Sequence, residues 1–246
     1  MYPRVKRILD VALSALMLIA LAPLLAAISI MICLDSPGPV FFLQRRVGRG
    51  GRLFRIYKFR TMYTYAPRSV ATSMLASAPE CITSLGRKLR KSSIDELPQL
   101  INVLHGEMSL IGPRPLVPEE GEIHEERTAL GAYRVRPGIT GWAQVNGRDC
   151  VSARTKAQLD AYYANNLSWR LDLKVLLYSV MCVITARGIQ EGGGVIEDAP
   201  YASSASISAA KRPNPRVRQN EWFERYDIES ARVYPRTARE PRAPGA

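Results

Sequence analysis

The stretch VALSALMLIALAPLLAAISIMICL, residues 11–34, contains no charged side chain. At about 1.5 Å per residue, a helix of this length can reach across a bilayer hydrocarbon core of roughly 30 Å. Pro23 lies in the middle of the run, where a proline removes a helical hydrogen bond and clashes with the preceding turn. The sequence therefore predicts a membrane-embedded segment that is interrupted at Pro23.

Basic side chains flank both ends of this apolar run. Lysine and arginine next to a membrane segment favour the cytoplasmic side, and a straight span would put one of the two clusters on the wrong side. We therefore expect a re-entrant helical hairpin that enters, breaks at Pro23 and leaves by the same face. A straight helix kinked at Pro23 is the alternative. The flanking residues are Arg4, Lys6 and Arg7 before the run, and Arg45, Arg46, Arg49, Arg52, Arg55, Lys58 and Arg60 after it.

The charge balance of the whole chain points to anionic partners. The 246 residues include 34 Lys and Arg against 22 Asp and Glu, which gives a formal charge of +12. Such a balance suits nucleic acid, anionic lipid or phosphorylated substrates. Four scattered cysteines without a CxxC pair exclude a disulfide scaffold, and two histidines exclude a His-rich zinc site.

The pattern of the remaining chain predicts an α/β protein that is mostly helical. Two β-rich runs, VFFLQRRVG (40–48) and RLFRIYKFRTM (52–62), predict a β-hairpin. We expect three parts: a membrane hairpin over 1–36, a catalytic domain over 37–196 and a disordered tail over 197–246. Helices are expected at 92–110, 156–166 and 172–185, a loop or short helix at 64–86, and structured loop at 112–147.

The segment SSIDELPQL, residues 92–100, places two adjacent carboxylates at the start of a predicted helix. Ser93 and Glu96 have the spacing of a capping box, and acidic residues in a first turn oppose the helix dipole. Alternatively, Asp95 is the N-cap and Pro98 occupies the first turn. Helix capping is therefore one interpretation of this pair, and chemistry is the other.

Cations near the pair favour the chemical interpretation. Arg90 lies shortly before it, and Arg114 follows in the motif GPRP. A carboxylate beside cations is expected to stay ionised, and the same cations form a natural phosphate site. Mg²⁺ suits a carboxylate next to a substrate phosphate, so Asp95 could attack a phosphorus atom. No P-loop and no G-x-G-x-x-G motif is present.

Four ordered motifs resemble the bacterial sugar transferases, the monotopic phosphoglycosyl transferases. The resemblance covers residues 3–195 and leaves out the tail. The motifs are KRILD (6–10) before the proline-broken apolar run, KFRTM (58–62), LRKSSIDELPQLINVLHGEMSLIGPRPL (89–116) and RPGITGWAQVNGR (136–148).

The resemblance implies transfer of a sugar 1-phosphate from a UDP-sugar to undecaprenyl phosphate, with release of UMP. The sugar is expected to be a hexose, galactose or glucose, and the reaction would begin exopolysaccharide or O-antigen assembly. Asp95 matches the family's covalent nucleophile and Mg²⁺ contact, and the adjacent Glu96 assists. Arg90 and Arg114 match arginines that hold phosphate. The enzyme would lie in the bacterial inner membrane with its catalytic domain on the cytoplasmic face.

Further residues complete the predicted substrate- and phosphate-binding set: Lys58, Arg60 and Arg136. Lys58 and Arg60 could equally face solvent or lipid headgroups. Two positions depart from the family pattern. Ala22 stands where many members have serine before the proline, and Glu107 stands where aspartate is common.

A membrane-anchored basic scaffold or nucleic-acid-binding protein is the rival function, because its arginines could contact phosphates without chemistry. The acidic pair speaks against it, since a binding module gains nothing from carboxylates beside its phosphate contacts. We therefore expect no nucleic-acid partner. The sequence leaves a homo-oligomer open.

Overall fold

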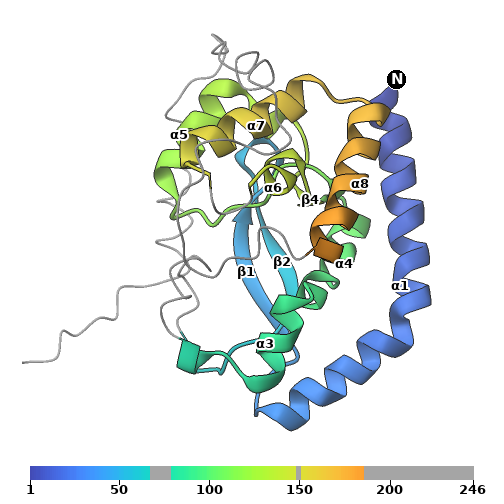
Figure 1. Cartoon of the computed structure of the whole chain (residues 1–246), viewed down its shortest axis with the longest axis vertical. Helices are drawn as coiled ribbons and strands as arrows, with labels where there is room; N and C mark the ends of the chain where they lie inside the picture. The colour runs from blue at the N-terminus through green and yellow to red at the C-terminus, as the bar shows by residue number, and fades with distance from the viewer. Residues whose placement is uncertain (67–78, 148–150, 186–246) are drawn as a thin grey trace, which may run out of the picture.

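The computed structural model describes residues 1–66, 79–147 and 151–185. The predicted tail over 197–246 lies outside the described residues. The described part is mostly helical, with an antiparallel pair, β1–β2, and a short parallel pair, β3–β4 (Figure 1). In chain order the elements are α1 (Tyr2–Asp35), β1 (Phe41–Val47), η1 (Arg49–Gly51), β2 (Leu53–Phe59), η2 (Pro79–Cys81), α3 (Ser84–Lys91), η3 (Ile94–Glu96), α4 (Gln99–His105), β3 (Ser109–Ile111), α5 (Gly121–Leu130), η4 (Ala132–Arg134), β4 (Gly138–Thr140), α6 (Trp142–Val145), α7 (Ala153–Asn165) and α8 (Trp169–Thr185).

The apolar run forms α1, one continuous helix of 34 residues that contains Pro23. The helix runs down one side of the molecule and then turns beneath it (Figure 1). Within the described residues it is the one helix long and apolar enough to cross a membrane. The structure thus has a bent helix rather than two separate antiparallel helices.

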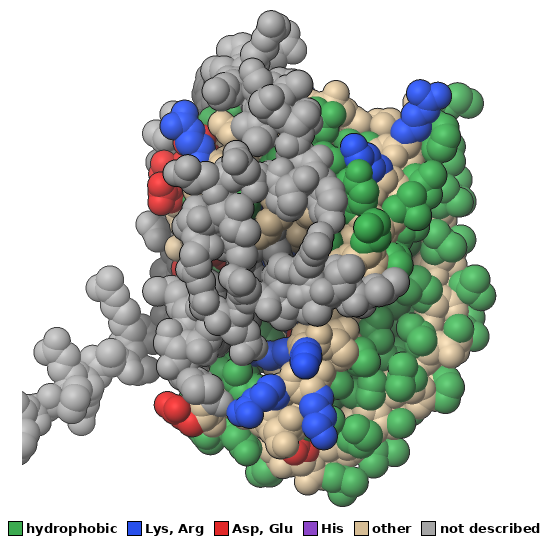
Figure 2. Space-filling view, viewed as in Figure 1, with side chains coloured by type: hydrophobic (Ala, Val, Ile, Leu, Met, Phe, Trp, Pro, Cys, Tyr) green, Lys and Arg blue, Asp and Glu red, His purple; other side chains and the backbone are tan. Residues whose placement is uncertain are grey.

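Large apolar side chains cover the outer surface of α1. Hydrophobic side chains spread along the side of the molecule where α1 lies (Figure 2). So much exposed apolar surface is typical of contact with a membrane or another protein. The exposed residues are Val5, Ile8, Leu9, Leu13, Leu16, Met17, Ile19, Leu24, Ile30, Met31 and Leu34.

Charged side chains tie the N-terminal end of α1 to the rest of the protein. Lys6 Nζ lies 2.8 Å from Asp172 Oδ2 in α8. Asp10 accepts a hydrogen bond of 2.7 Å from Ser109 Oγ in β3. The Arg7 guanidinium donates to two carbonyl oxygens in the last turn of α4. The N-terminal end is therefore docked by polar contacts.

The C-terminal end of α1 docks on the same domain by apolar packing. Ile28 and Ile32 are buried in one cluster with Phe59 of β2 and Leu89 of α3. Burying side chains of this size stabilises the contact by about 1.5–3 kcal/mol each. Both ends of α1 are therefore attached to one body, and its exposed middle lies between them.

The guanidinium of Arg60 closes the C-terminal end of α1. Its Nη2 donates to the carbonyl oxygens of Ile32 at 3.2 Å and Ser36 at 2.6 Å, and its Nη1 donates to that of Pro37 at 2.6 Å. Ile32 lies in the last turn of α1, and Ser36 and Pro37 follow the helix, so the guanidinium joins the end of α1 to the turn after it. Gly38 has a φ of +128°, and a Cβ there would lie 2.1 Å from Arg60 Nη1, so the turn requires glycine.

The predicted β-hairpin is confirmed. β1 pairs with β2 in an antiparallel register in which Phe42 faces Lys58 and Arg46 faces Phe54. Since side chains alternate between the two faces of a strand, Arg46 and Lys58 lie on the same face of the hairpin. That face contributes cations to the candidate site described below.

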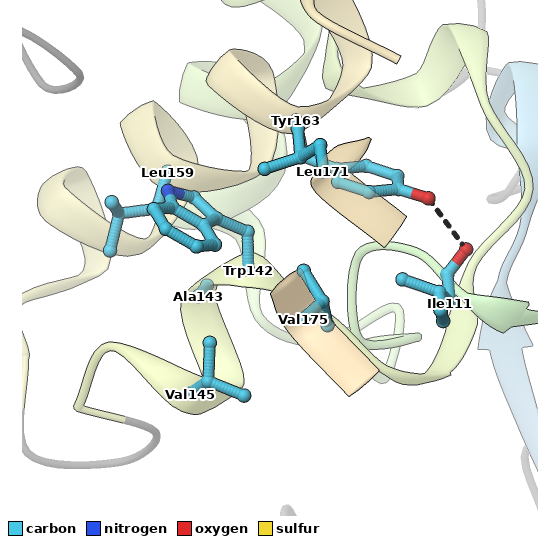
Figure 3. Close-up of a cluster of buried hydrophobic side chains, with 8 residues drawn as sticks. All are labelled: Ile111, Trp142, Ala143, Val145, Leu159, Tyr163, Leu171 and Val175. Atoms are coloured by element: carbon cyan, nitrogen blue, oxygen red, sulfur yellow. Dashed lines mark hydrogen bonds between the residues drawn. The ribbon is translucent and has the colours of Figure 1, made fainter. Parts of the chain in front are cut away.

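The main hydrophobic core joins α6, α7 and α8 (Figure 3). Trp142 packs with Leu159, Leu171 and Val175, and the Tyr163 hydroxyl donates a hydrogen bond of 2.9 Å to the Ile111 carbonyl oxygen. The helices predicted at 156–166 and 172–185 correspond to α7 and α8 and are confirmed.

Two predictions of secondary structure are wrong. Residues 92–110 do not form one helix, because Ser93 adopts a left-handed conformation with φ 57° and Gly106 ends α4. The end of that segment instead forms β3, which pairs with β4. The region 112–147 is not all loop, since α5 occupies its middle. Frequent Gly and Pro on both sides of α5 concealed it.

Candidate active site

The two carboxylates of the SSIDELPQL segment lie in η3, between α3 and α4. Asp95 is 8% exposed and Glu96 is 9% exposed, so both are buried. Glu96 Oε1 accepts from Lys58 Nζ at 2.8 Å and from Arg114 Nη2 at 3.2 Å. The fold therefore brings together groups from β2, η3 and the loop after β3.

The capping interpretation of this pair is wrong. Ser93 makes no side-chain capping bond, and the Glu96 carboxylate contacts Lys58 and Arg114 rather than the backbone of a first turn. α4 begins later, at Gln99, with Pro98 as its N-cap residue. The carboxylates are thus free of a helix-capping role.

Asp95 and Glu96 differ in their contacts although they are adjacent. Two cations hold Glu96, whereas the Asp95 carboxylate makes no side-chain hydrogen bond or ion pair within the part of the chain that the structure describes. A buried carboxylate without such a partner is costly to keep, because desolvation disfavours its charged form. Costly groups of this kind cluster at functional sites.

The electrostatics follow from this burial. Burial raises the pKa of Asp95, and the nearby Glu96 charge raises it further, while Lys58, Arg90 and Arg114 oppose the shift. Sequence reasoning considered only the cations and so missed the dominant cause. Burial likewise lowers the pKa of Lys58, and the Glu96 carboxylate opposes that shift.

Arg90 approaches the pair from α3. Its Nε donates to Thr61 Oγ1 at 3.0 Å, and its Nη2 lies 3.3 Å from Met62 Sδ. Its charge acts on Asp95. Arg90 therefore belongs to the same site as Lys58 and Arg114.

Two other predicted phosphate ligands lie elsewhere. Arg60 is occupied at the end of α1, as described above. Arg136 Nε donates to the Gly106 carbonyl oxygen at 2.8 Å, at the opposite end of α4 from Asp95. These contacts give Arg60 and Arg136 anchoring roles and lend no support to a phosphate contact.

The structure adds Arg46 to the site. This side chain is buried, and its Nη1 donates to the Pro115 carbonyl oxygen at 3.2 Å. Burial and the nearby charge of Arg114 lower the pKa of Arg46 to about 10. Sequence reasoning counted Arg46 among a row of flanking cations. The alternation of β1, which puts it on the face of Lys58, was the signal that could have found it.

A family model described as bacterial sugar transferase matches residues 1–186. The chain belongs to the bacterial sugar transferase family. The resemblance drawn from its four motifs is thereby confirmed.

Relatives within the family include three informative proteins. The uncharacterized sugar transferase EpsL of Bacillus subtilis is 39% identical over 83% of this chain and 98% of its own length. The undecaprenyl-phosphate glucose phosphotransferase of Komagataeibacter xylinus is 43% identical over 74% of this chain. An Aeromonas hydrophila transferase named for N-acetylgalactosamine phosphate is 40% identical over 76% of this chain. The chain spans 36% and 45% of the lengths of the last two.

The Mg²⁺ that the resemblance implies can be compared with the donors of this site. The described residues contain no group of three or more His, Cys, Asp or Glu side chains that could enclose a metal. Mg²⁺, however, commonly uses one or two carboxylates together with substrate phosphates and water. The Asp95 carboxylate, which forms no ion pair among the described residues, suits that mode, so the donors of the candidate site fit Mg²⁺ brought together with a phosphorylated substrate.

Proposed function

We propose that the protein transfers a sugar 1-phosphate from a UDP-sugar to undecaprenyl phosphate through a covalent intermediate on Asp95. UMP would be released, and the product would begin exopolysaccharide or O-antigen assembly at the cytoplasmic face of the bacterial inner membrane. One observation carries this proposal: the buried Asp95 carboxylate, which forms no ion pair among the described residues, lies beside Glu96, and Lys58 and Arg114 hold Glu96 in place.

The proposed reaction has two steps. An Asp95 oxygen attacks the phosphorus next to the sugar, and the bond to the UMP oxygen breaks. An oxygen of undecaprenyl phosphate then attacks the same phosphorus, which releases the Asp95 carboxylate and forms the lipid diphosphate sugar. Lys58, Arg90 and Arg114 supply positive charge where negative charge develops. Mg²⁺, when bound, would neutralise part of the diphosphate charge.

The role of Glu96 follows from its two ion pairs. It accepts from Lys58 and Arg114 at one oxygen, so it holds both cations next to the carboxylate that follows Asp95 in the chain. Charged groups that are already oriented stabilise a transition state without reorganising at the moment of reaction. Glu96 thus assists by orienting the phosphate ligands.

The attachment of α1 supports a monotopic arrangement. Both ends of α1 dock on the domain that carries Asp95, through Lys6 and Asp10 at one end and Arg60 at the other. A straight span would require this domain on both sides of the bilayer. A bent α1 whose exposed middle enters one leaflet satisfies both attachments and the basic flanks.

A cysteine-labelling experiment tests this topology. Arg4→Cys and Pro39→Cys place thiols at two exposed positions, one before the apolar run and one after it. A membrane-impermeant maleimide should label both in inverted vesicles and neither in intact cells, relative to the parent protein. Labelling of either position from outside would contradict the re-entrant arrangement.

The reaction itself is tested with a panel of UDP-sugars and undecaprenyl phosphate. The nucleotide product distinguishes the proposal, because phosphosugar transfer releases UMP and simple glycosyl transfer releases UDP. We propose glucose or galactose as the sugar. The relatives named for glucose and N-acetylgalactosamine phosphates show that family membership alone does not decide it. Release of UDP, or no nucleotide product with any donor, would contradict the proposal.

The pH dependence of donor turnover gives a second test. Asp95 must be ionised to attack, so kcat/KM should fall as the pH drops through the pKa of Asp95. Because that pKa is raised, the midpoint of this fall should lie above the ordinary aspartate value of about 3.9. Glu96→Gln removes a negative neighbour and should move this midpoint to lower pH. Arg90→Gln removes a positive neighbour and should move it to higher pH. Shifts in the same direction would show that Asp95 does not set the midpoint.

A basic scaffold or nucleic-acid-binding role is not favoured. Family membership points to transfer chemistry. The cations nearest the candidate site also face buried carboxylates, which would repel a nucleic-acid backbone.

A further inference from the structure

The segment that carries Arg114 is held along its backbone by other elements. Four consecutive carbonyl oxygens each have a partner from β1 or α5. The contacts are Arg127 Nη1 to Arg114 O at 2.9 Å, Arg46 Nη1 to Pro115 O at 3.2 Å, Val47 N to Leu116 O at 2.9 Å and His124 Nε2 to Val117 O at 2.8 Å.

The donors are themselves fixed. Arg127 is 2% exposed and forms an ion pair with Asp160 of α7, which is 1% exposed. His124 is fully buried and also contacts the Tyr133 hydroxyl. Burial lowers the pKa of His124 to about 4, so its ring is neutral at pH 7. A neutral ring has one N–H, and Nε2–H donates to Val117 while Nδ1 accepts from Tyr133.

The segment is stiff within itself as well. Pro113 and Pro115 flank Arg114, and each ring fixes φ near −65°. A Cβ on Gly112 would lie 2.4 Å from the Arg136 carbonyl oxygen, so the chain also passes closely beside the β4 segment. Against this fixed backbone, the Arg114 side chain remains 26% exposed and reaches Glu96.

We propose that Arg46 and Arg127 are positioning residues for the transfer reaction. They fix the backbone at 114–117 so that the Arg114 guanidinium meets the phosphate bound beside Asp95 and Glu96. The inference rests on the proposed function, because it assigns Arg114 to substrate phosphate. Asp160 acts one step further away, through Arg127.

Stability alone does not explain this arrangement. A buried ion pair such as Arg127 with Asp160 is often no more stabilising than apolar side chains of similar size. Both buried arginines nonetheless donate to adjacent carbonyls of one short segment, from two different elements. That convergence fixes the geometry at Arg114, where a displacement of about 1 Å can cost on the order of 100-fold in rate.

Two variants loosen the segment and are chosen to keep the fold. Arg127→Met combined with Asp160→Leu removes the donor to Arg114 without leaving a buried charge alone. Arg46→Lys keeps the positive charge near Arg114 but replaces the planar group that reaches Pro115. Each should lower kcat/KM for the UDP-sugar by about 10- to 100-fold.

A double-mutant cycle with Arg114→Ala shows whether Arg46 and Arg127 affect the reaction through Arg114 or through a general loss of structure. If Arg46 and Arg127 act through Arg114, each loosening variant should change kcat/KM by less than about twofold in the Arg114→Ala background. An equal loss in both backgrounds would overturn the inference. Arg114→Ala without effect on its own would instead contradict the proposed function, so the two failures are distinguishable.

Leu159→Ala is the matched control. Leu159 is fully buried in α7 next to Asp160, and it packs in the core of Figure 3, which includes none of residues 114–117. It should lower the melting temperature while kcat/KM per folded molecule stays within about twofold. A loss in this control as large as in the loosening variants, or failure of both loosening variants to fold, would assign these contacts to stability and overturn the inference.

Discussion

Asp95→Asn should abolish donor turnover and at the same time raise the melting temperature at pH 7. The amide cannot act as the attacking oxygen, and removal of a nucleophile costs on the order of 10⁴-fold or more. Measuring UMP release with purified protein checks the first half of this prediction. Residual turnover within tenfold of the parent would exclude Asp95 as the nucleophile.

The gain in stability follows from the raised pKa of Asp95. Its folded pKa lies above the unfolded value of about 3.9, so the group favours folding below that pH. This contribution is lost as pH rises through the folded pKa, and at pH 7 the buried charge opposes folding. Asn removes that charge, so the gain in melting temperature should shrink as pH falls toward 4.

Glu96→Gln is the control for this stability effect. Glu96 is paired with Lys58 and Arg114, and its neutralisation leaves the buried Lys58 ammonium without its close carboxylate. Breaking such a pair is destabilising. The two neighbouring substitutions should therefore change the melting temperature in opposite directions. A lower melting temperature for both would contradict the conclusion that Asp95, unlike Glu96, forms no stabilising ion pair among the described residues.

Arg60→Met should produce the largest loss of stability. The guanidinium makes three hydrogen bonds to carbonyls at the end of α1 and is 6% exposed. A buried polar group left without a partner costs about 1–3 kcal/mol, so the loss should reach about 3–5 kcal/mol in the free energy of unfolding. Denaturation of the protein in detergent, with proteolysis at residues 36–40 as a local readout, measures it.

Arg55→Met is the matched control, because Arg55 lies in β2 and Arg60 directly follows that strand. Arg55 is exposed, so its replacement should change stability by less than about 0.5 kcal/mol. Equal effects of the two substitutions would show that Arg60 does not anchor α1. Normal stability but lost donor binding in Arg60→Met would instead restore the phosphate role first predicted for it.

The parts of the fold that local pattern controls could be predicted from the sequence. Alternation of apolar and basic residues predicts the β1–β2 hairpin, and helical spacing predicts α7 and α8. The break of residues 92–110 could not be predicted, because it depends on the left-handed Ser93 and on pairing of β3 with the distant β4. The hydrophobic spacing of 97–108 satisfies both a long helix and a shorter one.

The candidate site, like the fold, could be predicted from the sequence only in part. Motif spacing identified Asp95, Glu96, Lys58, Arg90 and Arg114, and the fold brings them together. The sequence does not distinguish one arginine of a motif from another. Tertiary contacts decide whether its guanidinium binds a carboxylate or a backbone carbonyl. The sequence therefore could not distinguish Arg60, which donates to backbone carbonyls, from Arg114, which meets Glu96, and it did not indicate that Arg46 is buried.

In the proposed reaction the Asp95 carboxylate becomes bonded to phosphorus during turnover. The most direct measurement is mass spectrometry of the protein after brief incubation with UDP-sugar in the absence of acceptor lipid. We expect a phosphohexose on the peptide that contains Asp95, one UMP released per adduct, and loss of the adduct when undecaprenyl phosphate is added. Product formation at the full rate without any such adduct, or an adduct on another residue, would contradict it.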